Sequence, residues 1–484
     1  MPRYWVGLDQ GSGATKACLL DRRGRLRRLV TLPVRTRYPA PGRAEQDAEA
    51  LARSVRLALD RVLRGIAPAA VGAVGIACQR STFLFWDADT GRALTPAISW
   101  QDRRAESLCR SLSRHEDRIR RRTGLLLSPH YAASKIRWFL DRSPDLRRRV
   151  ERGKARLGTL DAYLLDRLTG GAHWSTDPTH AARTLLMDLR TLDWDPFLLE
   201  LFRVPVEALP PIRPTAYPVG EIPVRGAFLP LSATVGDQQA ALIGLGCGRA
   251  GEAAINYGTG AFVIVNTGTR ILRLPGLLTS VAWSSRATKR YLVEGTINAA
   301  GTALEWIGNL VGRSPHGLRG FPDLDQLPLV IPAFSGLGAP YWVGAARAAL
   351  LGLDLRTGGA DLMAATLAGI GCRVREILEA MKKGGLRPDR IVTGGGLAHR
   401  PFLLRLQATL LGRTILRAAI AEGTARGAAL LAGHALGHWR CDREPQLAVP
   451  MESVPPSKAA EPAERYYRRF RRSVAHVART GAAG

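Results

Sequence analysis

One carboxylate stands out in the middle of the chain, at Asp237 in the stretch VGDQQAALIGLG (235–246). Its neighbours are small, apolar or amide-bearing, and a buried carboxylate costs several kcal/mol unless it is paired or used. One interpretation is a helix N-cap, because an aspartate before an alanine-rich run is typical of a helix start. The other is a general base placed at the start of that helix. The residue alone leaves both interpretations open.

Two glycine-rich turns carry a second kind of chemistry. The first, QGSGAT (10–15), joins the apolar runs YWVGLD (4–9) and KACLLD (16–21). The second lies in EAAINYGTGAFVIVNTGT (252–269), again as a strand, a Gly-Thr-Gly turn and a strand. Glycine and hydroxyl residues at a hairpin tip let backbone N–H groups approach an anion. The repeated glycine-rich turn, together with the TGGG run at 393–396, indicates phosphate binding, although no Walker A loop is present.

The elements that position these turns alternate between strand and helix. Residues 47–66 predict an amphipathic helix, because apolar side chains recur there at three- and four-residue spacing. Further predicted elements are strands at 70–78 and 390–396 and helices at 361–381, 401–412 and 424–437. The alternation predicts an α/β fold, and the repeated hairpin predicts duplicated domains that face a shared cleft.

The length of 484 residues exceeds one ordinary core and predicts two domains. We place the boundary in the glycine-rich stretch IGLGCGRAG (243–251), which gives domains at 1–243 and 244–484. From about Arg440 the sequence is proline-rich and then charged, and this composition predicts a peripheral tail.

The formal net charge of +28 comes mostly from arginines that are spread along the chain. Runs such as DRIRRRTG (117–124) are typical of solvated helix faces, so we expect no nucleic-acid partner. No apolar run is long enough to cross a bilayer, and the first residues lack a signal core. The six cysteines are scattered without a CxxC pair, which favours a reducing cytoplasm over a disulfide framework.

Nine short stretches, in order from Gly7 to about Trp439, resemble the FGGY family of carbohydrate kinases. They are GLDQGS, ACQRSTFLFWDADTG, ISWQDRR, GTLDAYLLDRLTGG, TLDWD, VGDQQAALIG, NYGTGAF, IPAFSGLGAPYW and TGGG. Within the family, NYGTGAF and AFSGLGAPYW favour the glycerol-kinase branch over the pentulose-kinase branches. The resemblance implies two actin-like ATPase domains, each of the ribonuclease-H-like α/β type, with ATP and Mg²⁺ in the cleft between them.

The resemblance also implies roles for particular residues. Asp237 matches the catalytic base, and Asp9 matches the aspartate that helps to hold the magnesium. The positions that match polyol-binding residues are Arg80, Ser81, Trp100, His130, Asp237, Gln238 and Phe262. The positions expected near the nucleotide are Gln10, Gly11, Ser12, Lys16, Gly258, Thr259, Gly260, Gly301, Glu305, Gly395 and Gly396.

The chain departs from the family pattern at several of these positions. Ser81 replaces a glutamate that binds glycerol hydroxyls, and His130 aligns with a tyrosine that helps to close the pocket. The first turn has Gly13 and Lys16 where the family has a threonine pair and an arginine. Loss of the glutamate removes a strong charged acceptor and predicts a roomier, less anionic pocket.

The predicted activity is transfer of the γ-phosphate of ATP to a hydroxyl of a small polyol or sugar. Glycerol or a glycerol-like polyol is the expected substrate, and a pentulose or pentitol is the alternative. A nucleotide-binding scaffold and a basic nucleic-acid-binding protein are alternatives of another class. Retention of Asp9, Asp237 and Thr259 argues against the scaffold. A homodimer remains an open possibility for the assembly.

Overall fold

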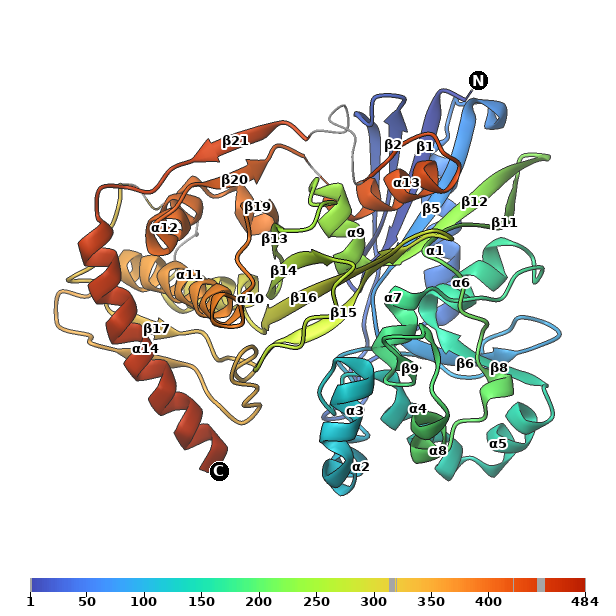
Figure 1. The fold of residues 1–484 in the computed structure, drawn as a ribbon, viewed down its shortest axis with the longest axis horizontal. Helices are drawn as coiled ribbons and strands as arrows, with labels where there is room; N and C mark the ends of the chain where they lie inside the picture. Colours follow the sequence, from blue (N-terminus) through green and yellow to red (C-terminus); the bar gives the residue numbers. More distant parts are fainter. Residues whose placement is uncertain (1, 313–317, 319, 421, 442–448, 484) are drawn as a thin grey trace.

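The computed structural model describes residues 2–312, 318, 320–420, 422–441 and 449–483. Two mixed β-sheets with helices packed against them form the framework of the chain (Figure 1). The predicted α/β class is therefore confirmed. Both hairpins predicted from the sequence are present, and each lies near the middle of its sheet.

The first sheet has six strands and is built from the N-terminal half of the chain. Across the sheet the order is β11 (Ala216–Val224), β12 (Ala227–Gly236), β5 (Val71–Cys78), β1 (Tyr4–Gln10), β2 (Ala14–Asp21) and β3 (Leu26–Pro33). Strands β1, β2 and β3 pair antiparallel, whereas β5 and β12 run parallel to β1. Strands β1 and β5 are almost fully buried, as expected for apolar strands in the middle of a covered sheet.

The second sheet repeats this order of pairings and adds one strand at an edge. Its strands are β15 (Leu278–Ser284), β16 (Lys289–Ile297), β14 (Ala261–Gly268), β13 (Glu252–Tyr257), β19 (Arg390–Gly395), β20 (Ile415–Ala418) and β21 (Met451–Val454). Strands β13, β14 and β16 pair antiparallel, and β19 and β20 run parallel to β13. The repeated hairpin in the sequence thus belongs to a repeated sheet topology.

Two helices lie between the sheets in Figure 1, α9 (Asp237–Gly244) and α13 (Gly423–Ala435). They pack against each other, and α13 also packs on β1, β5 and β12. Helix α13 can lie this close to β1 and to α9 only because the residues at the contacts are glycines. A Cβ atom on Gly7 would overlap the carbonyl oxygen of Ala425, and one on Gly427 would overlap that of Ala240.

The remaining helices cover the outer faces of the sheets. Helix α1 (Ala48–Val62) packs on β1, β2 and β3 with its apolar face and confirms the helix predicted at 47–66. On the second sheet the helices are α10 (Gly301–Leu310), α11 (Gly359–Lys383) and α12 (Pro401–Leu411). These helices confirm the predictions at 361–381 and 401–412, and α13 confirms that at 424–437.

Residues 79–215 form a smaller layer beside the first sheet (Figure 1). Its strands are β6 (Phe83–Asp87), β7 (Ala97–Ile98) and β8 (Ala155–Thr159), with the pair β9 (Met187–Asp188) and β10 (Asp193–Trp194), and β4 (Glu45–Gln46) from an earlier part of the chain pairs with β7. Its helices are α2 (Glu106–Ser111), α3 (Glu116–Thr123), α4 (Ala132–Arg142), α5 (Pro144–Glu151), α6 (Leu160–Leu168), α7 (Pro178–Ala181) and α8 (Pro196–Phe202). A short pair in the other half joins β17 (Leu329–Ile331) and β18 (Ala349–Leu351).

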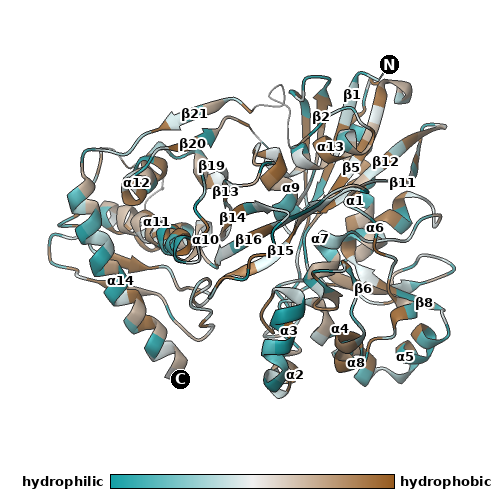
Figure 2. Cartoon of the chain, in the orientation of Figure 1, coloured by the Kyte–Doolittle hydropathy of each residue, from teal (hydrophilic) through white to brown (hydrophobic). Residues whose placement is uncertain are grey.

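The predicted peripheral tail is wrong for the residues described after Arg440. Strand β21 pairs with β20 and completes the edge of the second sheet, and α14 (Ala460–Ala483) packs on the elements beside it. In Figure 2, hydrophilic and hydrophobic residues alternate along α14. Its side chains Tyr466, Tyr467, Phe470 and Val474 are buried in the main hydrophobic core of that half. The charged composition belongs to the outer face of the helix, and the apolar stripe explains why it folds.

Replacement of Phe470 by alanine tests whether α14 belongs to the core. Phe470 is fully buried, whereas Phe228 is 66% exposed and provides a matched control. We expect Phe470→Ala to lower the free energy of unfolding by about 3–5 kcal/mol, because it removes a buried aromatic ring and leaves a cavity. Phe228→Ala should change it by less than about 1 kcal/mol. Urea unfolding measures both, and equal effects would mean that α14 is not a core element.

Candidate active site

The functional residues gather where parallel strands end. Gln10 at the end of β1, Cys78 at the end of β5 and Gly236 at the end of β12 lie side by side in the first sheet. The residues that follow these strands are Gly11 and Ser12, then Arg80 and Ser81, then Asp237. In open α/β sheets, ligands bind beyond the carboxyl ends of the strands. The topology therefore brings residues from three distant sequence motifs to one edge.

Asp237 is the first residue of α9, and the N-cap is Gly236. The N-cap interpretation is thus wrong, although Asp237 Oδ1 accepts a hydrogen bond from the backbone N–H of Gln238 at 2.8 Å. The same oxygen lies 3.2 Å from Nε of Arg80. The Asp237 side chain is 26% exposed, so it has a stable partner and still faces solvent. A carboxylate in this position can accept a proton from a bound hydroxyl.

Arg80 is held in place by a second carboxylate that sequence reasoning missed. Its Nη1 lies 3.0 Å from Glu294 on β16, and Glu294 also pairs with Arg183. Burial alone would raise the pKa of Glu294, but Arg183 and Arg80 lower it to about 2. The ring of Phe262 lies 5.5 Å from the Arg80 guanidinium carbon. The sequence did contain a signal for this pair. Glu294 stands inside the apolar strand YLVEGTI, and a charged side chain that is buried there needs a partner of opposite charge.

Two aromatic rings and an amide complete the group of predicted polyol-binding residues. The rings of Trp100 and His130 lie 5.4 Å apart. Burial lowers the pKa of His130 well below its usual value, and the nearby cations Lys135, Arg183 and Arg80 lower it further. The amide oxygen of Gln238 accepts a hydrogen bond from Asn256 Nδ2 at 3.0 Å. His130 is therefore a neutral ring near the Arg80 and Glu294 pair.

Ser81, which is predicted to enlarge the substrate pocket, lies in the turn after β5, and the size of the pocket stays a prediction. Ser81 is fully buried, and its hydroxyl oxygen has no hydrogen-bond partner. Its φ is 65°, a left-handed conformation that is uncommon for a residue other than glycine. A serine with this backbone conformation shapes the turn after β5.

The first hairpin carries a buried carboxylate and a paired lysine. Burial raises the pKa of Asp9 well above its usual value; Glu422 and Asp237 raise it further, and Lys16 lowers it. Asp9 Oδ1 is buried without a hydrogen-bond partner. Lys16 Nζ lies 2.5 Å from Glu422, the residue that precedes α13. The orphaned Asp9 oxygen is the kind of ligand that a divalent cation takes, and among the described residues Asp9, Glu422 and Asp237 do not converge on one ion-sized site.

The second hairpin, the start of α10 and the end of β19 converge. The tip residues Gly258 and Thr259 are exposed, and the N–H of Gly301 at the start of α10 donates to the Gly258 carbonyl at 3.0 Å. Gly395 has a φ of 86°, and a Cβ atom there would overlap the carbonyl oxygen of Tyr257. Gly260, Gly396 and Glu305 adjoin these residues. The structure thus brings the hairpin tip at Gly258 close to Gly301, and the end of β19 at Gly395 close to the end of β13, whereas the nucleotide contacts of these positions stay a prediction.

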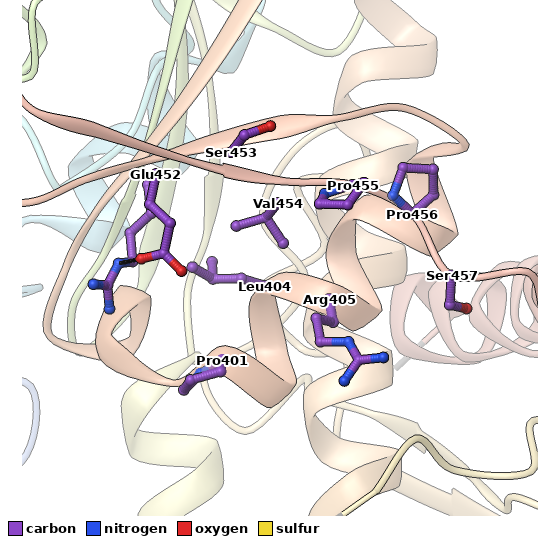
Figure 3. A pocket seen from close by; sticks show the side chains of 10 residues that line it. Pro401, Leu404, Arg405, Glu452, Ser453, Val454, Pro455, Pro456 and Ser457 are labelled. Atoms are coloured by element: carbon purple, nitrogen blue, oxygen red, sulfur yellow. Dashed lines mark ion pairs between the residues drawn. The ribbon is translucent and has the colours of Figure 1, made fainter.

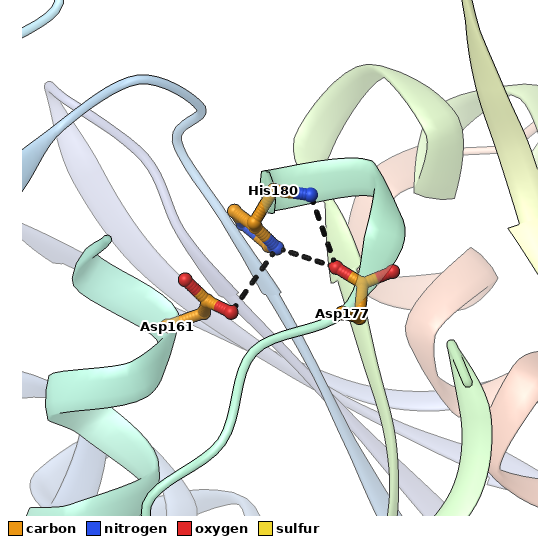
Figure 4. A group of neighbouring side chains, drawn as sticks. All are labelled: Asp161, Asp177 and His180. Carbon is orange, nitrogen blue, oxygen red and sulfur yellow. Dashed lines mark hydrogen bonds and ion pairs between the residues drawn. The ribbon is translucent and has the colours of Figure 1, made fainter. Parts of the chain in front are cut away.

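A buried charged cluster behind Asp237 was also missed by sequence reasoning. Figure 4 shows Asp161, Asp177 and His180 converging, with His180 Nδ1 2.8 Å from Asp177 Oδ1 and 3.5 Å from Asp161 Oδ2. All three side chains are buried. Burial would lower the pKa of His180, but Asp161 and Asp177 raise it to about 9. At neutral pH the ring is therefore an imidazolium between two carboxyl groups.

A pocket elsewhere on the molecule contains none of the predicted site residues. It lies between α12 and β21, and its charged side chains are Arg405, Arg417 and Glu452 (Figure 3). Arg417 and Glu452 already pair with each other at 2.8 Å.

Among the residues described, no helix combines the length and the hydropathy that crossing a membrane would need.

Comparison with known proteins assigns the chain to a family. Residues 4–244 match the N-terminal domain of the FGGY family of carbohydrate kinases, and residues 253–436 match its C-terminal domain. The chain is 41% identical to a glycerol kinase of Thermus brockianus, over 98% of both chains. The chain belongs to the FGGY family of carbohydrate kinases. It is an ATP-dependent kinase of small polyols or sugars with two actin-like domains.

Other relatives and solved structures agree with this assignment. The kinase is 37% identical to glycerol kinase 1 of Pseudomonas aeruginosa, over 91% of this chain and 92% of that one. It superposes on the glycerol kinase of Plasmodium falciparum with ADP at a TM-score of 0.87, with 25% identity and 98% of both chains covered. A xylulose kinase of Rhodospirillum rubrum shares the fold, at a TM-score of 0.85 and 22% identity over 99% of this chain and all of that one.

The raised pKa of His180 predicts a pH dependence of stability. The ordinary pKa is 6.5 and the folded value is about 9, so the stabilisation is complete below pH 6.5 and is lost as pH rises through 9. At about 1.4 kcal/mol per unit, the total is about 3 kcal/mol. We expect His180→Asn, which retains a donor near the Nδ1 position, to lose this dependence. Unfolding free energies of both proteins at pH 6, 7.5 and 9 measure it, and parallel curves would contradict a charged His180.

Proposed function

We propose that the kinase transfers the γ-phosphate of ATP to a hydroxyl of glycerol or a glycerol-like polyol, with Asp237 as the catalytic base. The observation that carries the proposal is the position of Asp237. Its carboxylate is paired with Arg80 and partly exposed, and it stands beyond the strand ends of the first sheet. The glycerol kinases among the relatives support glycerol as the substrate.

In this proposal the two hairpins hold the phosphates of ATP from opposite sides. Phosphoryl transfer needs in-line positioning and neutralisation of phosphate charge, and little covalent chemistry from the protein. Backbone N–H groups at exposed glycine tips, and the lysine beside the first tip, meet the second need. The proposed phosphate-contacting residues are Gln10, Gly11, Ser12, Lys16, Gly258, Thr259 and Gly260. The proposed residues of the adenosine side are Gly301, Glu305, Gly395 and Gly396.

A magnesium ion would be held at Asp9. The orphaned Oδ1 atom of Asp9 fits a divalent cation. When bound, such an ion neutralises charge on the β- and γ-phosphates. Its charge would also favour the ionised form of Asp9, whose pKa burial raises.

The polyol would lie against Asp237 between Arg80 and the aromatic residues. We propose that Arg80 and Gln238 donate hydrogen bonds to substrate hydroxyls, and that Trp100, His130 and Phe262 enclose its carbon chain. Ser81 follows Arg80 in the chain, and we propose that it acts through the turn that it shapes. Removal of the proton from the attacking hydroxyl by Asp237 then accompanies phosphate transfer.

We also propose the domain boundaries, the cellular location, the partners and the assembly of the enzyme. We place the domains at 1–243 and 244–484 and the protein in the cytoplasm. We expect no nucleic-acid or membrane partner, since many arginines already pair with carboxylates, as Arg147 does with Asp141 and Arg465 with Asp325. A homodimer is the proposed assembly.

Replacement of Asp237 by asparagine tests the catalytic base. The amide is nearly isosteric, so we expect the fold and the affinity for ATP to remain, but it cannot accept a proton. The rate of phosphate transfer should fall by about 10²–10⁴. A coupled ADP-release assay and nucleotide titration measure the two properties. Turnover at the parental rate would show that Asp237 has no role as a base.

A substrate comparison tests glycerol against the pentulose alternative. We expect kcat/KM for glycerol to exceed that for xylulose by at least about tenfold. Ser81→Ala should leave kcat/KM for glycerol within about twofold, because the hydroxyl is buried and makes no hydrogen bond. A preference for xylulose would replace the glycerol proposal. A large loss in the alanine variant would make Ser81 a direct ligand.

A further inference from the structure

The buried cluster of Asp161, Asp177 and His180 is connected to the start of α9. Asp177 accepts hydrogen bonds on both oxygens, including one at 2.8 Å from the hydroxyl of Thr179. The Thr179 oxygen in turn accepts a hydrogen bond at 2.7 Å from the backbone N–H of Gly236. Gly236 immediately precedes Asp237, so the cluster reaches the catalytic residue through a single threonine.

The Thr179 hydroxyl donates to one group and accepts from another. A threonine hydroxyl has one proton, and Asp177 Oδ1 takes it, so the remaining lone pairs point toward donors such as the Gly236 N–H. Thr179 is fully buried, and no water competes for these bonds at its surface. His180 Nδ1 lies 2.8 Å from Asp177 Oδ1 and holds this carboxyl group in its orientation inside the protein (Figure 4).

A second connection runs from the same segment to the Asp237 carboxylate. Arg183, four residues after Thr179, pairs with Glu294, which holds Arg80 at 3.0 Å. Arg80 lies 3.2 Å from Asp237. The short segment 177–183 therefore fixes both the backbone before Asp237, through Thr179, and its carboxylate, through Arg183. Both connections are buried, where a lost hydrogen bond is costly.

We propose that Thr179 is a positioning residue for the catalytic base, held by the Asp177–His180 pair and acting through its hydrogen bond to the Gly236 amide. The bond fixes the direction in which α9 begins and hence where the Asp237 carboxylate meets the attacking hydroxyl. A displacement of about 1 Å at a reacting group lowers rates by as much as about 10². The inference rests on the proposed role of Asp237.

Thr179→Val tests the proposal, because valine keeps the shape and removes the hydrogen bonds. We expect the rate of phosphate transfer in a single turnover to fall about tenfold, with KM for ATP and glycerol within twofold. Thr179→Ser should restore the rate to within about twofold. Thr184→Val is the matched control: Thr184 directly follows this segment, is also buried, and also accepts a backbone N–H bond, which comes from Leu186 instead of Gly236. Its rate should stay within twofold of the parent.

A double variant separates positioning from general damage. If Thr179 acts through Asp237, Thr179→Val should cause no further loss in the Asp237→Asn background, because residues that act as a unit are not additive. A full tenfold loss there, or an equal loss in Thr184→Val, would overturn the proposal. Thr179→Ala replaces the valine variant if that variant does not fold. Parental turnover in Asp237→Asn would overturn the proposed function itself, whereas an unaffected Thr179→Val with an impaired Asp237→Asn would overturn only this inference.

Discussion

The close packing of α13 against the first sheet is the constraint on which the rest of the structure depends. Gly7 and Gly75 lie under carbonyl oxygens of the helix, and Gly427 lies under a carbonyl oxygen of α9, so no larger residue fits at these crossings. The contact joins a helix from the end of the chain to its first strand. Because α13 also packs against α9, which contacts β13, the contact links the first sheet to the second.

Charge in the site is balanced through chains of buried pairs. Asp237, Arg80, Glu294 and Arg183 alternate in sign, and each member between the ends has partners on two sides. Such alternation lets ionised groups remain buried, where an isolated charge would be neutralised. Asp9 is the exception, because like charges and burial raise its pKa and one of its oxygens lacks a partner.

Local patterns in the sequence predicted the hairpins, the amphipathic helices and the place of Asp237, because each depends on residues close together in the chain. The pairs Arg80–Glu294 and His180–Asp161 could not be predicted in this way, since their partners meet only through the fold. The error at α14 had another cause. Its apolar residues recur at helical spacing, but arginines are interspersed among them, and the charged composition concealed the apolar stripe that is buried. Ser81 has a left-handed backbone conformation, which no pattern in the sequence predicts.

The position of α13 also bears on how the protein is made. The helix that covers β1 and β5 ends at Ala435, so this face of the first sheet has no cover until nearly the whole chain has been synthesised. At the usual ribosomal rate of about 5–20 residues per second, roughly 20 to 70 s separate the exit of β5 from that of α13. Strand β21 and helix α14 follow later still and complete the second sheet and its core. Until α13 has been synthesised, the nascent chain therefore carries β1 and β5 without cover on one face, the kind of apolar surface that chaperones bind.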